Sequence, residues 1–335
     1  MNLLSHLRDK HRGIPSGIGR LVAVASLLVS AATPADIVRA VRLSENPILT
    51  PRSSPTVGDN LNGPSLIRVP DWVEKPLGHY YLYFAHHEGK FIRLAYANRV
   101  EGPWTVYEAG TLHLSAVTHC HDHIASPDVH VDESRHQIRM YFHCPAEGTS
   151  RDIGIQKSFV GLSHDGLHFS PIEVPLGDPY FRVFRWHGYY YALARAGVLL
   201  RSHDGLTPFE TGPALFADDA KLVLRHAAVD VQGNRLAIYY SRIGDRPERI
   251  LLSYISLVPD WRAWKASPPV TVISPETPEE GSDRPLEVSK IGEAEVRVRE
   301  LRDPAIFHDG GKTYLLYSIA GEAGLSIAEL LHSSK

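Results

Sequence analysis

The feature that most constrains this chain is a unit of about 50 residues that recurs five times after residue 44. Each unit holds a short apolar segment, a turn with Gly, Asp, Asn or Ser, a Tyr-rich segment and a third apolar segment. Hairpins need such turn residues, so each unit predicts at least three antiparallel strands. The Tyr-rich segments, which show the repeat best, are 79–87, 137–144, 188–197, 234–244 and 312–322.

Five small sheets in a row predict an all-β fold, a five-bladed β-propeller. A single sheet cannot bury both of its faces, whereas sheets packed around a common axis bury one another. The last unit stops after its third strand, so we expect an N-terminal strand near 47–49 to complete the last blade and close the ring. A β-sandwich is the structural alternative, but it would not repeat the same group of three strands five times. The polar segment 268–299 is expected to be a loop over one face or the rim.

Residues 1–36 are expected to be a leader, and residues 37–335 a single propeller domain. Basic residues up to Arg20 precede the apolar run 21–32, an order that is typical of a signal peptide. The run is too short for a comfortable membrane span. We therefore expect a periplasmic or secreted protein, or a cytoplasmic one if the leader is not a signal peptide. Export would allow one disulfide bridge between the two cysteines, Cys120 and Cys144.

Charge and composition narrow the class of partner. The formal net charge of -3 offers no basic field, so we expect no nucleic-acid partner. Apart from the leader, no segment could span a membrane, so the mature chain is expected to have none. The 15 Tyr and 5 Trp suit strands, and they also suit surfaces on which sugar rings stack.

Polar side chains concentrate where the innermost strands of the predicted propeller begin, next to the axis. These starts hold Asn62, Ser126, Tyr180 with Arg182, Arg225 with His226, and Arg302 with Asp303. The loops over the same face hold His86, His87, Glu88, Arg195, Asp245, Glu248, Arg249 and Glu322. Charge and desolvation would shift the pKa of any carboxylate in such surroundings, so we predict a functional site at the axis.

Glycoside hydrolysis needs two carboxyl groups on opposite sides of the scissile bond. Asp303 is the only carboxylate at an innermost-strand start, so it is predicted as base or nucleophile, with Glu248 and Glu322 as candidate acids. The predicted substrate-binding residues are Asn62, His86, His123, Asp128, Arg182, His226, Arg249 and Arg302. Their three arginines favour an acidic sugar. Alternatively, the pairs Arg302–Asp303 and Glu248–Arg249 only hold adjacent blades together.

The densest cluster of ligand-type residues is the run 119–123, His-Cys-His-Asp-His. In an extended strand His119, His121 and His123 share one face, and His143 or Asp128 would complete a transition-metal site. The spacing matches no established zinc pattern. We therefore predict no metal or cofactor and favour substrate contact by His123, with a structural or axial metal ion as the open alternative.

The segment 302–307, Arg-Asp-Pro-Ala-Ile-Phe, and the repeat itself resemble the five-bladed propeller glycoside hydrolases, notably family 43 and its relatives, over about residues 44–331. His226 is similar to a blade-four histidine of that group. The resemblance implies a propeller that cleaves sugars with a base Asp in blade one, a second Asp in blade two and an acid Glu in blade three. Here Asn62 and Ser126 stand at the first two places, and 177–180 shows no Glu. The chain also resembles uncharacterised bacterial propeller proteins in the phrases NGPSLIRVPDW, RDPAIF and ERILLS.

These observations predict a carbohydrate-active enzyme, a glycoside hydrolase that acts on plant or algal poly- or oligosaccharide through an acid pair at the axis. A non-catalytic carbohydrate-binding propeller is the first alternative, because the usual acids are missing. A metal-dependent lyase or lactonase is the second, because of the histidines. Geometry separates them: two open carboxyls favour hydrolysis, converging ligands favour metal, and carboxylates that are all paired with Arg favour binding alone.

Overall fold

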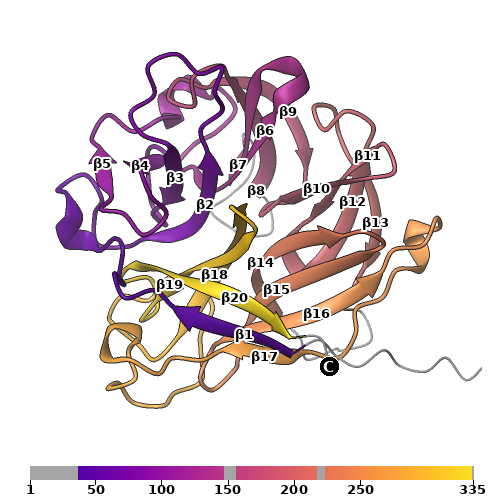
Figure 1. Cartoon of the computed structure of the whole chain (residues 1–335). Coiled ribbons are helices and arrows are strands. Elements are labelled where there is room, and N and C mark those ends of the chain that lie inside the picture. The colour runs from indigo at the N-terminus through magenta and orange to yellow at the C-terminus, as the bar shows by residue number, and fades with distance from the viewer. Residues whose placement is uncertain (1–36, 147–155, 217–222, 334–335) are drawn as a thin grey trace, which may run out of the picture.

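The computed structural model describes residues 37–146, 156–216 and 223–333, which form five four-stranded antiparallel sheets. The sheets stand around a central axis like the blades of a propeller (Figure 1), so the predicted fold class is confirmed. In blades one to four the strands follow chain order from the axis outwards: β2 (Asn62–Arg68), β3 (Tyr80–Ala85), β4 (Arg93–Ala97) and β5 (Thr105–Tyr107); β6 (Ala125–Asp132), β7 (Gln137–Pro145), β8 (Gln156–Ser163) and β9 (Ser170–Gly177); β10 (Arg182–Trp186), β11 (Tyr189–Leu193), β12 (Val198–Ser202) and β13 (Glu210–Ala214); β14 (Val223–Gln232), β15 (Arg235–Ile243), β16 (Ile250–Ser256) and β17 (Val270–Ile273).

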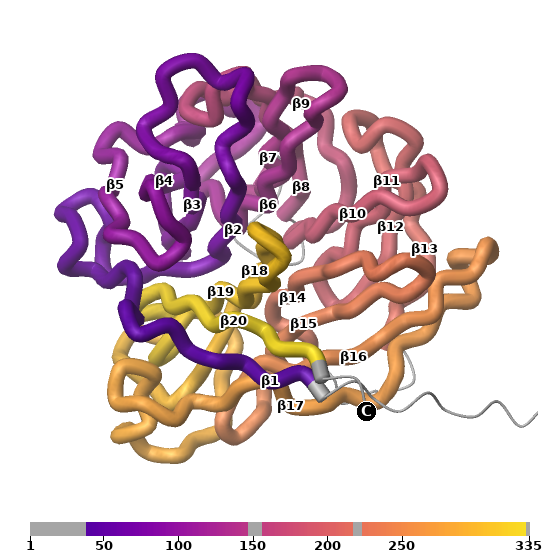
Figure 2. Tube along the Cα trace, viewed as in Figure 1, coloured from indigo at the N-terminus to yellow at the C-terminus, as the bar shows by residue number. Residues whose placement is uncertain are grey.

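The fifth blade closes the ring with both ends of the described chain. It holds β18 (Leu301–Asp309), β19 (Lys312–Ile319), β20 (Leu325–Ser333) and, outermost, β1 (Ile37–Arg42). Figure 2 shows β1 lying along β20, and every residue of β1 has a partner there. Closure by an N-terminal strand is confirmed, but its predicted place at 47–49 is wrong. That segment makes only the bridge Leu49↔Leu325, because Pro47 lacks a donor and the chain turns into η1 (Pro51–Ser53).

The buried apolar residues explain why the chain needs all five blades. They form five clusters, one at each interface between neighbouring blades. Every residue of β3 is buried, because blades two and five cover its two faces. Strands buried on both faces become continuous apolar runs, which is what the Tyr-rich segments of the repeat are.

The innermost strands bulge where they reach the axis. The register of the β2, β6, β14 and β18 pairs shifts near their starts. Gly63, Ser126 and Asp303 take positive φ values of 54°, 51° and 50° at three of these starts, and Tyr180 takes 67° just before β10. Such backbone is unfavourable for residues other than glycine and clusters at functional sites.

The predicted loop 268–299 contains β17 and the short helix η7 (Pro278–Glu280), so it supplies the fourth strand of blade four. Its later part returns to the axis and hydrogen-bonds to the end of β15. Within the described ranges no helix is long and apolar enough to cross a membrane. The predicted leader, 1–36, lies outside the described residues.

Candidate functional site

A cavity of about 560 Å³ opens at the axis, where the innermost strands begin. Residues from blades one to five and from the loop before β18 form its walls, among them Asn62, His87, His123, Tyr180, His226 and Glu322. Most of these side chains are polar or ionisable. The cavity therefore lies where the strand starts predicted a functional site.

Glu322, in the loop between β19 and β20, is a buried carboxylate in the wall of this cavity. Its Oε2 lies 2.7 Å from His87 Nδ1 and accepts a hydrogen bond from the Asn60 side chain, and its Oε1 accepts from Arg302 Nη1 at 3.0 Å. Burial by itself would raise the pKa of Glu322. His87, Arg302 and Asn60 outweigh burial and hold that pKa well below its usual range. Glu322 is therefore held as an ionised carboxylate in the cavity wall.

A network of buried charges lies around Glu322. Arg302 also donates to Glu300 at 2.8 Å, and both residues are buried. Arg225 binds both oxygens of Glu248, at 2.8 and 3.0 Å, and Ser241 Oγ donates to Glu248 at 2.6 Å. The Glu248 side chain is 0% exposed and does not line the cavity. These bidentate and short contacts are geometrically specific and hold the cavity wall in one arrangement.

His226 and Asp303 form a buried dyad between blades four and five. His226 Nδ1 is hydrogen-bonded to Asp303 Oδ1, and Ser318 Oγ donates to Asp303 Oδ2 at 3.2 Å. Because a carboxylate only accepts, Nδ1 carries the proton and Nε2 keeps its lone pair. Burial, and then the charges of Arg182 and Arg225, lower the pKa of His226 well below its usual value. His226 is thus a neutral, oriented imidazole on the cavity wall.

Aromatic rings continue this wall towards blade two. Tyr180 lies between His226 and His143, with ring centroids 4.6 and 4.1 Å away. Burial first, and then nearby His123, lower the pKa of His143 well below its usual value. Among the described residues, neither His143 Nδ1 nor Gln156 Oε1 has a hydrogen-bond partner, although both atoms are buried. Flat rings beside unused hydrogen-bonding groups are what a sugar ring requires of a binding wall.

The free energy of unfolding is expected to fall as the pH drops below 6.5, because His143 and His226 are buried in their neutral form. Unfolded, both rings gain a proton near their usual pKa of 6.5; folded, they gain it only at lower pH. From these two rings alone the unfolded state binds up to two more protons than the folded state, a contribution of up to ~2.7 kcal/mol per pH unit in that window. Urea unfolding at several pH values measures the slope. His143→Gln should remove one of the two contributions and make the slope shallower, and stability that is flat below pH 6.5 would contradict the prediction.

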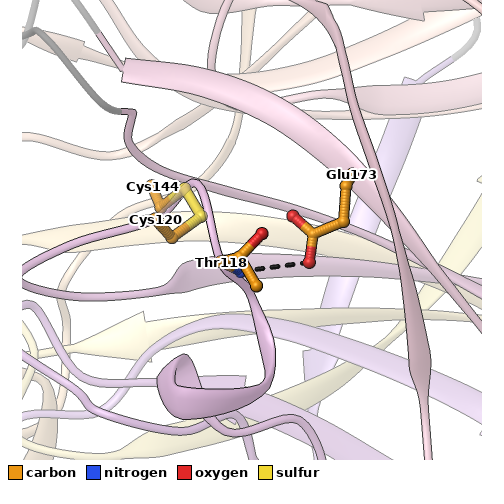
Figure 3. The surroundings of a disulfide bond; sticks show 4 residues. All are labelled: Thr118, Cys120, Cys144 and Glu173. Carbon is orange, nitrogen blue, oxygen red and sulfur yellow. Dashed lines mark hydrogen bonds between the residues drawn. A yellow bond between two sulfur atoms is a disulfide. The ribbon is translucent and has the colours of Figure 1, made fainter.

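A disulfide bridge between Cys120 and Cys144 fastens the loop that carries His123 to β7. Cys120 also pairs with Ala146 across a β-bridge, and the backbone N of Thr118 donates to Glu173 of β9 at 3.0 Å (Figure 3). The loop is therefore tied to two strands of blade two. Disulfides persist in oxidising compartments, so the bridge agrees with the predicted export, which stays a prediction.

The cavity brings together part of the predicted site. Asn62, His123, His226 and Glu322 line it, and Asp303 lies directly behind His226. Arg302 lies behind the wall and binds Glu322, as described above. No measurement bears on the catalytic and binding roles predicted for these residues, which stay predictions.

Four further residues that were predicted to bind substrate do not line the cavity, namely His86, Asp128, Arg182 and Arg249. Arg182 is buried and donates to the carbonyl oxygens of Ala227 and Pro127 at 2.9 and 3.2 Å. Asp128 accepts from the backbone N of Val183 at 2.7 Å and from His130 at 2.8 Å. Arg249 pairs with Asp245 at 3.2 Å, and His86 with Asp59 at 2.8 Å. None of the three arginines behind the acidic-sugar prediction faces the cavity, because each is held by other protein groups.

Several lining residues have no role predicted from the sequence. Tyr180 and His87 lie at the predicted axis without an assigned role, and His143 was predicted only as an alternative metal ligand. No sequence feature indicated Gln156 or Ile291. Gln156 is a polar residue at the start of β8, a strand with no catalytic signature. Ile291 comes from the long loop before β18, whose path no repeat predicts.

The histidine cluster 119–123 does not form a metal centre with its neighbours in the described part of the chain. No three His, Cys, Asp or Glu side chains converge there as metal ligands would. Cys120 is in the disulfide, and His123 lies beside Asp122 at 3.3 Å and faces the cavity. Rings, charged side chains and other polar side chains line the site.

The chain is similar to one curated protein over nearly its whole length. It is 36% identical over 322 aligned residues to the uncharacterised protein R118 of Acanthamoeba polyphaga mimivirus, a match that covers 87% of this chain and 90% of R118. The chain belongs to the R118 family. No family model matches it. Membership in the R118 family implies a shared fold and no particular activity.

Solved structures place the R118-family chain among known propellers. A putative glycoside hydrolase from Bacteroides ovatus matches with a TM-score of 0.60 at 11% identity, over 87% of this chain and 95% of that chain. A GH43 β-xylosidase/α-arabinofuranosidase from a compost metagenome, in complex with xylotriose, has a TM-score of 0.57 at 14% identity, over 89% and 96%. A GH43_1 enzyme from Xanthomonas citri with xylose has 0.55 at 13%, over 82% and 88%. These likenesses confirm the fold that the resemblance implied.

Proposed function

We propose that this protein hydrolyses a glycoside in the axial cavity. The observation that carries the proposal is the pairing, on one cavity, of an ionised carboxylate, Glu322, with a neutral imidazole oriented by a buried carboxylate, His226 with Asp303. The ring wall of Tyr180 and His143 supports a sugar as the ligand. The structural neighbours that carry xylose and xylotriose support pentosides as the first substrates to test.

The two groups suit two parts of the reaction. Positive charge develops at the anomeric carbon as the glycosidic bond breaks, and a carboxylate that stays ionised stabilises that charge. His226 Nε2, with its lone pair, accepts the proton of the attacking water, while Asp303 holds the ring in that tautomer. Asp303 thus takes part through His226 instead of touching the sugar, which modifies the role predicted from sequence.

Glu248 and Glu322 were predicted as proton donors. The lowered pKa of Glu322 favours a charge-stabilising role for it, and the clamp of Arg225 on Glu248 favours a positioning role for that residue. In this proposal Glu248 holds Arg225, and Arg302 holds Glu322.

A sugar-binding propeller without hydrolysis is the second candidate. The specific observation in its favour is that the buried carboxylates of the described axis are matched by Arg or His: Glu248 by Arg225, Glu322 by Arg302 and His87, and Asp303 by His226. Neutralised carboxylates can orient hydroxyl groups without transferring protons. The same ring wall would then bind the sugar.

A screen of purified protein against aryl glycosides and plant or algal oligosaccharides tests both candidates. We expect sugar release, and a fall on the order of 10²–10³-fold in Glu322→Gln, since a fixed charge at the reaction centre is lost. Glu329→Gln is the matched control, because Glu329 pairs with Lys312 on the outer part of the same blade. If no sugar is released but a ligand still raises the unfolding temperature of the protein, hydrolysis would be excluded and the sugar-binding propeller would be favoured.

A further inference from the structure

One side of the cavity mouth carries a group of apolar side chains. Val223, Leu224, Ile243 and Ile291 line the cavity on the side of blade four. Val223 and Ile243 are direct partners between β14 and β15, so their side chains are neighbours. Val223 is 49% exposed and Ile291 is 61% exposed. The opposite side, with Asn62, His87 and His123, is polar.

Ile291 projects from backbone that is held on both sides. Arg225 donates to the carbonyl oxygens of Lys290 and Gly292, the latter at 3.0 Å, and Arg302 donates to Gly292 at 3.1 Å. Two residues earlier, Ser289 exchanges backbone hydrogen bonds with Gly244 and Asp245 at the end of β15, at 3.2 and 3.0 Å. Both arginines are buried and clamped by glutamates. A buried ionic network thus fixes an exposed isoleucine at the rim of a polar cavity.

Exposed apolar side chains are ordinary when they are scattered, but here they are contiguous with a cavity. A ligand that enters this cavity meets polar groups at the floor and Ile291 and Val223 at the rim. We propose that these two residues form a subsite for the apolar, aromatic aglycone of a glycoside whose sugar ring lies in the cavity. This inference rests on the proposed function and names its substrate class: aryl glycosides rather than polysaccharide chains.

The chemistry of the site agrees with such a leaving group. An alcohol needs a proton donor to leave, and Glu322 is held ionised. A phenol is a weaker base and leaves more readily. Water adds through its oxygen to the anomeric carbon and gives one proton to His226 Nε2; the bond from that carbon to the aglycone oxygen breaks, and phenolate departs with the electron pair. The proton on His226 then neutralises the phenolate.

Matched pairs of methyl and phenyl glycosides, of β-xylose and of α-arabinofuranose, test the subsite by calorimetric titration and by kcat/KM. For a sugar that binds, we expect the phenyl glycoside to bind roughly ten-fold more tightly than the methyl glycoside, because the ring is removed from water against Ile291 and Val223. Ile291→Ser should reduce this preference to about two-fold, and Ile291→Leu should keep it. Val288→Ser is the control, because Val288 is 54% exposed in the same loop but does not line the cavity.

The two ways of failing are distinct. Equal affinity for both members of a pair, or an equal loss for both in Ile291→Ser, would overturn the aglycone subsite and leave the sugar site in place. Absence of binding and cleavage for all four glycosides would overturn the proposed function together with the subsite. If Ile291→Ser keeps the preference for phenyl glycosides, another part of the cavity wall binds the phenyl ring, and the subsite proposed at Ile291 is overturned.

Discussion

Asp303→Asn is expected to lower kcat/KM on the best glycoside by ~10³–10⁴-fold, the scale at which an imidazole loses its orienting carboxylate. The amide can present its NH₂ group to His226 Nδ1, and the ring then carries its proton on Nε2. Nε2 would have no lone pair for the attacking water. Steady-state kinetics on the wild type and the variant measure this loss directly.

The variant should fold, because asparagine is among the residues that best tolerate the positive φ of 50° at this position. A pH–rate profile separates orientation from structural damage. Without the carboxylate charge the imidazolium is less stable, so the acidic limb of kcat/KM should move to lower pH. Asp230→Asn is the matched control, since Asp230 pairs with His308 at 2.9 Å between the same two strands but away from the cavity. Full activity in Asp303→Asn would exclude the dyad from the reaction.

The repeat predicted the fold because the second strand of a blade must be apolar along its whole length. Neighbouring blades cover both faces of this strand, as they do for β3, so each unit of the sequence contains one recognisable apolar run. The closing strand escaped this reasoning, since β1 has no hairpin partner in sequence and pairs with the far end of the chain. The segment 47–49 is also apolar, but Pro47 lacks a donor and the chain turns into η1 directly after it.

The sequence could predict which residues lie at the axis, but not which partners their side chains contact. Strand starts placed Asn62, His226 and Asp303 at the axis, as the structure has them. Whether a charged side chain there faces the cavity or lies behind it depends on bulges and on loops of other blades. Arg182 turns away to backbone carbonyls, and Arg302 turns to two glutamates. Partners that distant in sequence leave no local pattern, so the sequence could not show that Arg182 and Arg302 turn away from the cavity.

Glu248→Ala is expected to lower the free energy of unfolding by about 3–5 kcal/mol, because it leaves the guanidinium of Arg225 buried without its counter-charge. Ser241 also loses the acceptor of its 2.6 Å hydrogen bond. Urea unfolding followed by tyrosine and tryptophan fluorescence measures the difference. Glu248→Gln keeps the acceptor oxygen and the shape, so it should cost less than Glu248→Ala.

Glu210→Ala is the matched control, since Glu210 pairs with Arg201 and Arg262 at the surface and its loss should leave the unfolding midpoint unchanged. The two glutamates thus compare a buried pair with an exposed one in the same protein. Glu248→Ala should also weaken the preference for phenyl glycosides, because Arg225 holds the carbonyl groups on either side of Ile291. A destabilised variant that keeps this preference would separate the ionic network from the rim and leave the network a purely structural role. A variant with wild-type stability would mean that water reaches Arg225 and replaces Glu248, contrary to the burial on which both expectations depend.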